Sequence, residues 1–401
     1  MAIDSRALLL ALAVLTACGS DSVTNPSVNK APTASAALVA ATDFSCGLAT
    51  SGMAYCWGAN HSGQLGIGTT QAAFAPTPVA ASEKFVAISG SHLSACALAS
   101  TGGVWCWGQT PGTALDTVKT PALEPASPHP LRSLTVGRLY ACGLDENGAA
   151  YCWGNNIRGQ LGVGDTLPRA TPTSVLGGLT FTQISAGFWH TCGITAAGAT
   201  YCWGDNSFFE GGFGSGVSLV KQPTMVAAPQ PFTFVAAGAL QTCALTAAGA
   251  AYCWGTNNTA QLGDGTTVDR LTPTPVAGNL SFASIRIAHN NQKNGHACAI
   301  TRDGLAYCWG ENASGETGAA PDGLCDGGVI GPVPCNRTPA RVAGAADVVA
   351  IEPGLAHTCA ITNTGILMCW GENQEGELGD GTTTDRLSPA AISGGVGFPN
   401  R

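Results

Sequence analysis

The chain has 401 residues, of which 45% are hydrophobic and 10% are charged, with 54 glycines, 23 prolines and a net charge of −8. This apolar content is sufficient for a core and excludes a disordered chain, while abundant glycine and proline indicate many short strands and turns. The acidic balance, without any block of lysine or arginine, argues against nucleic acid as a partner.

The first residues resemble the export signal of bacterial lipoproteins. Arg6 precedes an apolar run at 7–14 that is too short to span a membrane but suits a signal peptide. The sequence Leu15-Thr16-Ala17-Cys18 resembles a lipobox, which implies a signal peptide over 1–17 and acylation of Cys18. Gly19, in place of an aspartate, implies passage to the outer membrane. Asp4 weakens the basic character of the signal, so an ordinary cleaved signal peptide remains the alternative.

The next segment, 18–37, is polar, rich in small residues and interrupted by proline. Since it has little to bury, we expect a flexible tether. The rest of the chain, 38–401, is expected to form one folded domain.

That domain is built from one unit that returns seven times and is clearest at Ser185 to Gly204, SAGFWHTCGITAAGATYCWG. Each copy has two cysteines ten residues apart, with a glycine six residues after the first. The pairs are Cys46 and Cys56, Cys96 and Cys106, Cys142 and Cys152, Cys192 and Cys202, Cys243 and Cys253, Cys298 and Cys308, and Cys359 and Cys369. The glycines are Gly52, Gly102, Gly148, Gly198, Gly249, Gly304 and Gly365.

The unit predicts a β-hairpin whose three-residue loop ends in a left-handed glycine. In that register Cys192 faces Cys202, at the separation of about 4.5 Å that a disulfide can span. Cys325 and Cys335 form an eighth pair with the same spacing, which leaves Cys18 alone. Zinc ligands are not favoured because no Cys-x-x-Cys occurs. Eight disulfides predict an oxidising, exported location.

Both faces of each hairpin are apolar. A small residue after the first cysteine, such as Gly193, opposes a large one, such as Tyr201, and every second cysteine is followed by tryptophan. A strand precedes the hairpin, as at 181–185, and a proline-rich edge strand follows it, as at 272–276. Four-stranded sheets buried on both faces fit an all-β, seven-bladed β-propeller of antiparallel blades.

The chain ends predict how the ring closes. The first repeat starts at 36–40 without a preceding proline-rich strand, and the last repeat ends with such a strand at 388–392. We therefore expect the N- and C-terminal strands to complete one sheet together.

The pattern at Cys192 to Gly204, Asn155 to Gly164 and Trp254 to Gly265 resembles the regulator of chromosome condensation repeat. The resemblance implies a seven-bladed propeller. Family members include a nuclear exchange factor for a small GTPase, a plant ultraviolet sensor and the secreted beta-lactamase inhibitory protein of type II, so the fold alone says little about function.

Two sets of polar residues are candidate metal ligands. His190, His296 and His357 occupy equivalent positions, but no carboxylate repeats with them, and we expect their imidazoles to bond to strand or loop backbone instead. The loops 264–269 and 380–385 carry paired aspartates without a calcium-binding pattern, and turn chemistry explains them more simply. No metal and no cofactor is predicted.

The fourth repeat is the one that departs from the pattern with aromatic residues. Phe188 and Trp189 precede its hairpin, and Phe208 and Phe209 replace part of the usual GQLG loop. Exposed aromatics on loops are frequent binding anchors, so these four residues are the candidate binding site. The alternative is that they pack on one another or on the adjacent blade. The sixth repeat carries an insertion, 319–337, whose own cysteines should hold a protruding loop.

No nucleophile with a base, paired catalytic carboxylates or phosphate loop is evident, so no enzymatic activity is predicted. We expect a monomeric outer-membrane lipoprotein that contacts the membrane through its lipid anchor and binds an unknown protein through variable loops. A glycan-binding module and an inhibitor of a secreted enzyme are the alternatives.

Overall fold

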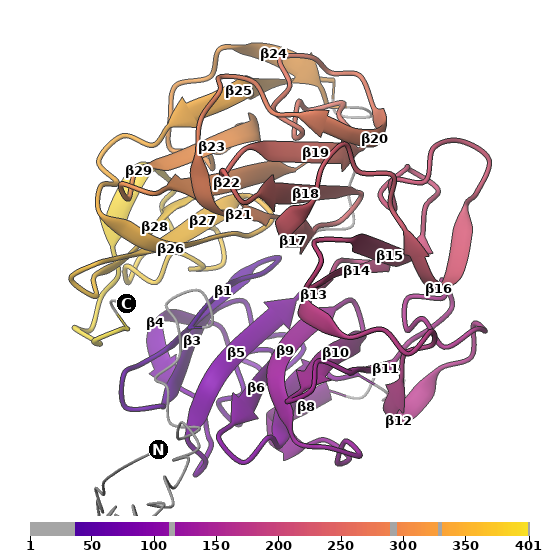
Figure 1. The fold of residues 1–401 in the computed structure, drawn as a ribbon. Helices are drawn as coiled ribbons and strands as arrows, with labels where there is room; N and C mark the ends of the chain where they lie inside the picture. The colour runs from indigo at the N-terminus through magenta and orange to yellow at the C-terminus, as the bar shows by residue number, and fades with distance from the viewer. Residues whose placement is uncertain (1–36, 112–116, 289–294, 328–330, 400–401) are drawn as a thin grey trace, which may run out of the picture. The chain divides into compact units, whose positions relative to one another are not determined.

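The structure, a computed structural model, describes residues 37–111, 117–288, 295–327 and 331–399. Residues 1–36 lie outside the described residues, and they include the expected signal peptide, Cys18 and nearly all of the expected tether. The described residues form an all-β, seven-bladed propeller without helices (Figure 1). Accordingly, none of them belongs to a helix long and apolar enough to cross a membrane.

Each blade is a meander of strands that follow one another in the chain. The first strands are β1 (Leu38–Ala40), β5 (Phe85–Ser91), β9 (Leu131–Gly137), β13 (Phe181–Ala186), β17 (Phe232–Ala237), β21 (Phe282–Ile287) and β26 (Val348–Pro353). The second strands are β2 (Phe44–Leu48), β6 (Ser94–Ala99), β10 (Tyr140–Asp145), β14 (His190–Thr195), β18 (Gln241–Thr246), β22 (His296–Thr301) and β27 (His357–Thr362).

The third strands are β3 (Ala54–Gly58), β7 (Val104–Gln109), β11 (Ala150–Gly154), β15 (Thr200–Asp205), β19 (Ala251–Gly255), β23 (Ala306–Glu311) and β28 (Leu367–Gly371). The fourth strands are β4 (Ala73–Pro78), β8 (Thr117–Leu123), β12 (Arg169–Ser174), β16 (Leu219–Met225), β20 (Arg270–Pro275), β25 (Pro332–Arg341) and β29 (Arg386–Ala391).

The predicted hairpin register is confirmed. Cys192 pairs with Cys202 and Gly193 with Tyr201, and Gly198 closes the loop with a φ of 77°. In all seven hairpins the disulfide joins directly opposed residues with Cα atoms 4.0 to 4.1 Å apart. One turn geometry therefore serves every repeat.

Neighbouring blades are joined by the tryptophan that follows the second cysteine, which is fully buried in every repeat. At six of the seven junctions its indole N–H donates to a backbone carbonyl in the long loop of the preceding blade, at 2.9 to 3.1 Å. The acceptors are Gln64 for Trp107, Gln160 for Trp203, Glu210 for Trp254, Gln261 for Trp309, Glu316 for Trp370 and Glu377 for Trp57.

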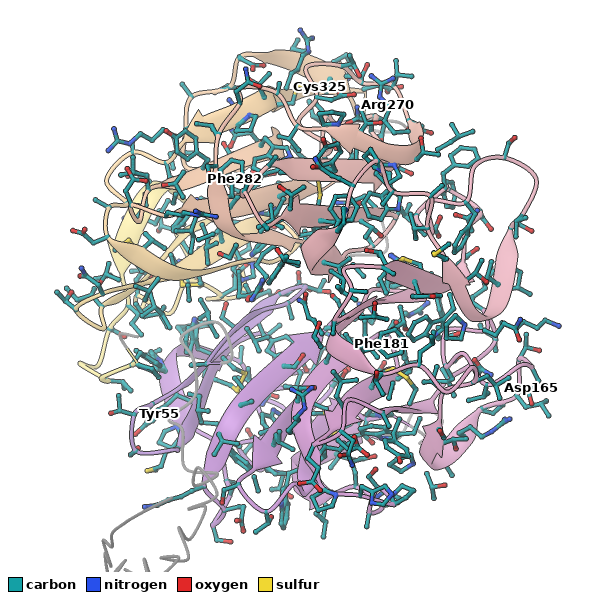
Figure 2. The ribbon with its side chains drawn as sticks, in the orientation of Figure 1. Tyr55, Asp165, Phe181, Arg270, Phe282 and Cys325 are labelled. Atoms are coloured by element: carbon teal, nitrogen blue, oxygen red, sulfur yellow. A yellow bond between two sulfur atoms is a disulfide. The ribbon has the colours of Figure 1, made fainter. Side chains whose placement is uncertain are left out.

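Aromatic residues at the start of the first strands complete these junctions. Phe181 packs 5.9 Å from Trp203 and Phe282 packs 6.0 Å from Trp309, measured between ring centroids. Figure 2 shows side chains filling the space between the blades. Rings packed at this distance in a buried setting contribute beyond simple burial of area.

The predicted mode of ring closure is wrong. Strands β1 to β4 form the first blade and β26 to β29 the last, so no sheet combines strands from both ends of the domain. The reason is that Ala73–Pro78 already supplies the fourth strand of the first repeat. Closure occurs instead by packing: Trp57 bonds to Glu377, and buried Phe398 lies in one apolar cluster with Leu38 and Trp57.

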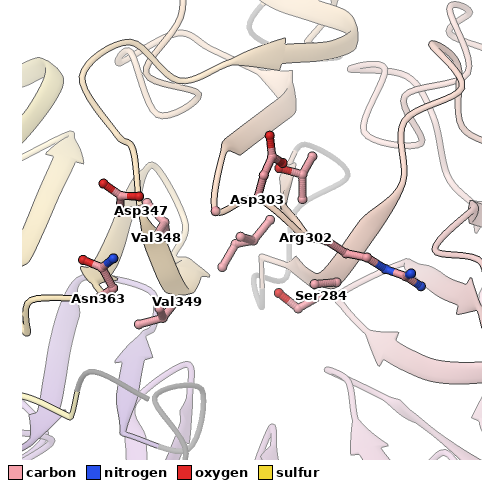
Figure 3. A pocket seen from close by; sticks show the side chains of 11 residues that line it. Ser284, Arg302, Asp303, Asp347, Val348, Val349 and Asn363 are labelled. Atoms are coloured by element: carbon pink, nitrogen blue, oxygen red, sulfur yellow. The ribbon is translucent and has the colours of Figure 1, made fainter.

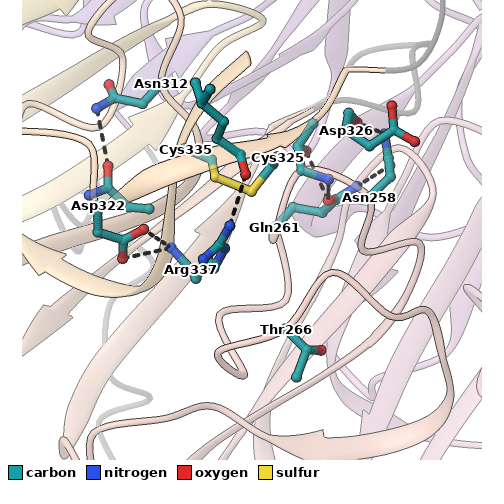
Figure 4. Close-up of a disulfide and its surroundings, with 12 residues drawn as sticks. Asn258, Gln261, Thr266, Asn312, Asp322, Cys325, Asp326, Cys335 and Arg337 are labelled. Carbon is teal, nitrogen blue, oxygen red and sulfur yellow. Dashed lines mark hydrogen bonds between the residues drawn. A yellow bond between two sulfur atoms is a disulfide. The ribbon is translucent and has the colours of Figure 1, made fainter. Parts of the chain in front are cut away.

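The sixth blade departs from the predicted four strands. The insertion adds a fifth strand, β24 (Gly323–Asp326), paired with β25, and the disulfide Cys325–Cys335 joins the two strands (Figure 4). Asn258 of the fifth blade donates to the carbonyl of Asp326 at 3.0 Å, and both cysteines pack against Ala260. The described part of the insertion therefore lies against its neighbour rather than protruding freely.

Candidate functional site

One end of the propeller carries the turns between first and second strands together with the long loops between third and fourth strands. We call this end the loop face. Because each blade is a simple meander, both kinds of connection must emerge there. The apolar cluster that joins Phe188 and Trp189 to Phe208 confirms that the two connections of the fourth repeat meet.

Phe188 is only 1% exposed, so for this residue the alternative of packing against its neighbours holds and the expectation of an open aromatic is wrong. Its ring packs against residues from three other blades: the imidazole of His92 at 5.8 Å, the guanidinium of Arg138 at 5.0 Å, and the side chains of Ala239 and Leu240. The turn residues of neighbouring blades thus cover it. Phe188 supports the surface rather than forming it.

Arg138 is the residue that sequence reasoning missed. Its guanidinium carbon lies 4.7 Å from the Trp189 ring centroid as well as 5.0 Å from that of Phe188, within the range of cation–π attraction. The two rings meet edge to face at 5.2 Å. Burial lowers the pKa of Arg138, though not enough to discharge it near neutral pH. Arg138 occupies in the third repeat the position of Phe188, a departure that inspection for aromatics alone overlooks.

Trp189, Phe208 and Phe209 are partly exposed. Trp189 contacts the guanidinium, Phe208 belongs to the same apolar cluster as Trp189, and Phe209 follows Phe208 in the long loop. We refer to Arg138, Trp189, Phe208 and Phe209 as the aromatic patch. It combines flat apolar surface with one positive charge, a combination often found in protein-binding anchors.

Phe209 has a left-handed backbone, with a φ of 66°. The equivalent position in the other long loops holds glycine or alanine with the same backbone, namely Gly63, Gly159, Ala260, Gly315 and Gly376. A bulky residue is rare there because its Cβ crowds the backbone. Strained backbone of this kind is found most often at functional sites.

The three equivalent histidines are structural, as expected, but their partner differs from the expected backbone. Thr242 gives its hydroxyl proton to the carbonyl of Glu210 at 2.7 Å, so the Nε2–H of His190 donates to that hydroxyl at 2.8 Å. The equivalent chains run from His296 through Thr358 to Glu316 and from His357 through Ser45 to Glu377. These imidazoles fasten one blade to the next.

In the loops 264–269 and 380–385, the first aspartate accepts hydrogen bonds from nearby residues of the chain. Asp264 accepts from the backbone and hydroxyl of Thr266 and from the guanidinium of Arg270, and Asp380 repeats the arrangement with Thr382 and Arg386. Among the described residues, no cluster of three or more histidine, cysteine, aspartate or glutamate side chains could hold a metal ion. Turn chemistry therefore accounts for both loops.

A cleft of about 540 Å³ lies between the sixth and seventh blades, on the end opposite the loop face (Figure 3). Asp303, Asp347 and Asn363 line it, while Arg302 points away and donates to the carbonyl of Ala247 at 2.7 Å. No histidine, cysteine or lysine is among the lining residues.

A second cavity, of about 340 Å³, is the central channel, which is lined by the first strands of the blades. Arg286 and Glu352 form an ion pair of 2.7 Å inside it, and Arg286 also lies 4.9 Å from the ring centroid of Phe234. The charges of Arg286 and Glu352 therefore neutralise each other in the wall of the channel.

The sequence profile described as the RCC1-like domain matches residues 15–292 and 112–398. The chain belongs to the RCC1-like domain family. It is 27% identical over 240 residues to the ultraviolet-B receptor UVR8 of Arabidopsis thaliana, covering 59% of the chain and 52% of the receptor. It is 28% identical over 160 residues to the human E3 ubiquitin-protein ligase HERC2, covering 40% of the chain and 3% of the ligase. The chain thus spans about half the length of the receptor and only a small part of the ligase.

Among solved structures, Prp20p of Saccharomyces cerevisiae superposes with a TM-score of 0.75 at 21% identity, covering 90% of the chain and 88% of Prp20p. At this identity the similarity bears on the fold. The RCC1-like fold predicted from the repeats is therefore confirmed.

Proposed function

We propose that this RCC1-like propeller is a non-catalytic, exported lipoprotein that binds a protein at the cell envelope through its loop face. The observation that carries the proposal is Phe209, an aromatic residue held in a backbone conformation that its sister repeats give to glycine or alanine. Folding alone would favour a small residue there, so binding is the better explanation of the aromatic side chain.

The rest of the aromatic patch supports a protein ligand. The Arg138 guanidinium is held over two rings and its buried Nε atom has no partner among the described residues. A partner carboxylate placed beside the guanidinium would be recognised by charge, while Trp189 and Phe208 supply apolar contact. Prp20p is described as binding Gsp1p and histones, which shows that a propeller of this fold can serve protein binding.

The cysteines support export. Sixteen of the 17 cysteines form eight disulfides, as is typical of oxidising compartments, and Cys18 is the remaining one. An unpaired cysteine within a lipobox-like sequence fits a lipid attachment site, with residues 18–37 as the tether. Mass spectrometry of the mature N-terminus should find an acylated Cys18, and an N-terminus elsewhere would refute the anchor.

The binding proposal is tested by capture from envelope extract with the oxidised protein, in parallel with a glycan array. Wild type should retain a protein that Trp189→Ala does not retain, whereas Val268→Ala, an exposed control on the fifth long loop, should retain it. Binding only to glycans would favour the glycan-binding alternative. Capture that is equal for all three proteins would contradict the aromatic patch.

A further inference from the structure

In the second blade the connection between the third and fourth strands, 110–116, is shorter than in the other blades, and only 110 and 111 belong to its described part. In the other six blades a left-handed glycine of this loop lies so close to the indole of the next tryptophan that a Cβ would come within 2.6 to 2.8 Å of it. These glycines are Gly66, Gly162, Gly212, Gly263, Gly318 and Gly379. No described glycine has Trp153 among its nearest neighbours. The junction between the second and third blades is therefore built differently.

At this junction Glu124 accepts the bond that a loop carbonyl accepts at the other six. The indole N–H of Trp153 donates to its Oε2 atom at 3.0 Å. The amide of Glu124 donates to Val104, the same backbone bond that valine or isoleucine makes in every other blade. Those residues are Val79, Val175, Val226, Val276, Val342 and Ile392. Six copies place an apolar side chain where the second blade places a carboxyl group.

Glu124 and Trp153 line a cavity of about 440 Å³ on the side opposite the loop face. Its walls include Glu124, Glu83, Trp105, Ser127 and His129, and no lysine or arginine lines it. Trp105 also departs from the repeats, since its position holds tyrosine in five copies and methionine in one. The short connection, the carboxylate of Glu124 and the indole of Trp105 thus all depart from the repeat pattern at the junction between the second and third blades.

An acceptor for Trp153 does not require a charge, because the other junctions use neutral carbonyls. Within the described residues, no ion pair engages Glu124, and Ser127 has a buried hydroxyl oxygen without a hydrogen bond. Burial raises the pKa of Glu124 to about 7, so the carboxylate is costly unless a cation joins it.

We propose that this cavity binds an organic cation, an alkylammonium or guanidinium group, between the carboxylate of Glu124 and the indole of Trp105. A second carboxylate, Glu83, lines the same cavity and adds to the attraction. Carboxylate and aromatic face together are a common means of recognising such cations. The net charge of −8 further favours a cationic ligand. The site is separate from the aromatic patch and does not depend on the proposed function.

The test uses the full oxidised protein labelled with ¹⁵N at its nine tryptophans, with indole signals followed by NMR. The probes are agmatine, N-acetyl-lysine methylamide and the neutral isostere N-acetyl-norleucine methylamide. We expect either cation, but not the isostere, to shift the Trp153 indole signal saturably. Tighter binding of agmatine would indicate a free small molecule, and tighter binding of the lysine derivative would indicate a basic side chain of a partner.

Glu124→Gln is the matched variant, because its amide oxygen can still accept from Trp153 while the charge is removed. We expect its affinity for the cations to fall by roughly tenfold or more, with its melting temperature maintained. Wild-type affinity should also fall as the pH is lowered through 7, since protonation removes the charge. The proposal would be overturned by the absence of saturable shifts, by equal binding of the norleucine derivative, or by unchanged affinity in Glu124→Gln.

Discussion

The indole nitrogen of Trp57 donates a 2.9 Å hydrogen bond to the backbone carbonyl of Glu377, which lies 320 residues further along the chain. The same bond, also 2.9 Å long, joins Trp203 to Gln160 inside the ring. The seam between the first and last blades is therefore constructed like an internal junction, although no strand is shared across it.

Trp57→Phe and Trp203→Phe should consequently destabilise the protein to a similar extent. Each removes a buried hydrogen bond and leaves a cavity, so we expect a loss of about 2–3 kcal/mol in the free energy of unfolding for either variant. Urea unfolding under oxidising conditions measures the free energy of unfolding of both variants. If only Trp203→Phe had an effect, the seam would be open and the packing account of closure would be wrong.

Phe209→Gly should stabilise the propeller while weakening its binding. Glycine relieves the left-handed strain at this position, worth about 1 kcal/mol, as it does at Gly159 in the equivalent loop. Denaturant midpoints report stability, and affinity for the captured protein reports binding. A lower midpoint would show that the Phe209 ring contributes to packing, and the strain argument would then fail.

Phe188 and Trp189 should separate into structural and binding roles. Phe188→Ala removes a ring that is 1% exposed and should cost about 3–5 kcal/mol. Trp189→Ala alters a partly exposed side chain and should cost less stability but more affinity. Thermal unfolding and binding of the two variants, measured side by side, distinguish the roles. Similar melting temperatures would contradict the support role assigned to Phe188.

Buried glutamates should make the protein most stable at mildly acidic pH. Burial raises the pKa of Glu316 to about 8 and those of Glu210 and Glu377 to about 7, so the folded state retains protons that the unfolded chain loses above its pKa of 4.5. Stability must therefore fall as the pH rises toward 8. Burial lowers the pKa of His296 and of His357 to about 3, so stability also falls as the pH drops below 6.5.

Glu316→Gln tests the alkaline part of this dependence. Glutamine occupies the same position in other repeats as Gln64, Gln160 and Gln261, where its side-chain oxygen accepts an amide two residues earlier. The variant should gain on the order of 2 kcal/mol at pH 8 and little at pH 5. An equal effect at both pH values would exclude ionisation of Glu316 as the cause.

The repeats allowed the hairpins, disulfides and blade number to be predicted because packing imposes the same residues seven times. Closure was mispredicted because the first repeat has an edge strand of its own, Ala73–Pro78, which carries Pro76 and Pro78 and already completes the first blade. Burial of Phe188 could not be read from its own repeat, since His92, Arg138 and Leu240 cover it from other blades. The sequence does carry the anomaly of Glu124, since the equivalent residue is valine or isoleucine in the other six repeats.

The most direct test of a protein-binding loop face is amide hydrogen exchange of the propeller with and without its captured partner. The account predicts protection concentrated at 187–190 and 205–213, which include Trp189, Phe208 and Phe209. The turn at Ala196–Gly198 on the opposite end should exchange at the same rate in both states. Protection confined to the hairpin turns or to the outer strands, with 205–213 unchanged, would contradict the account.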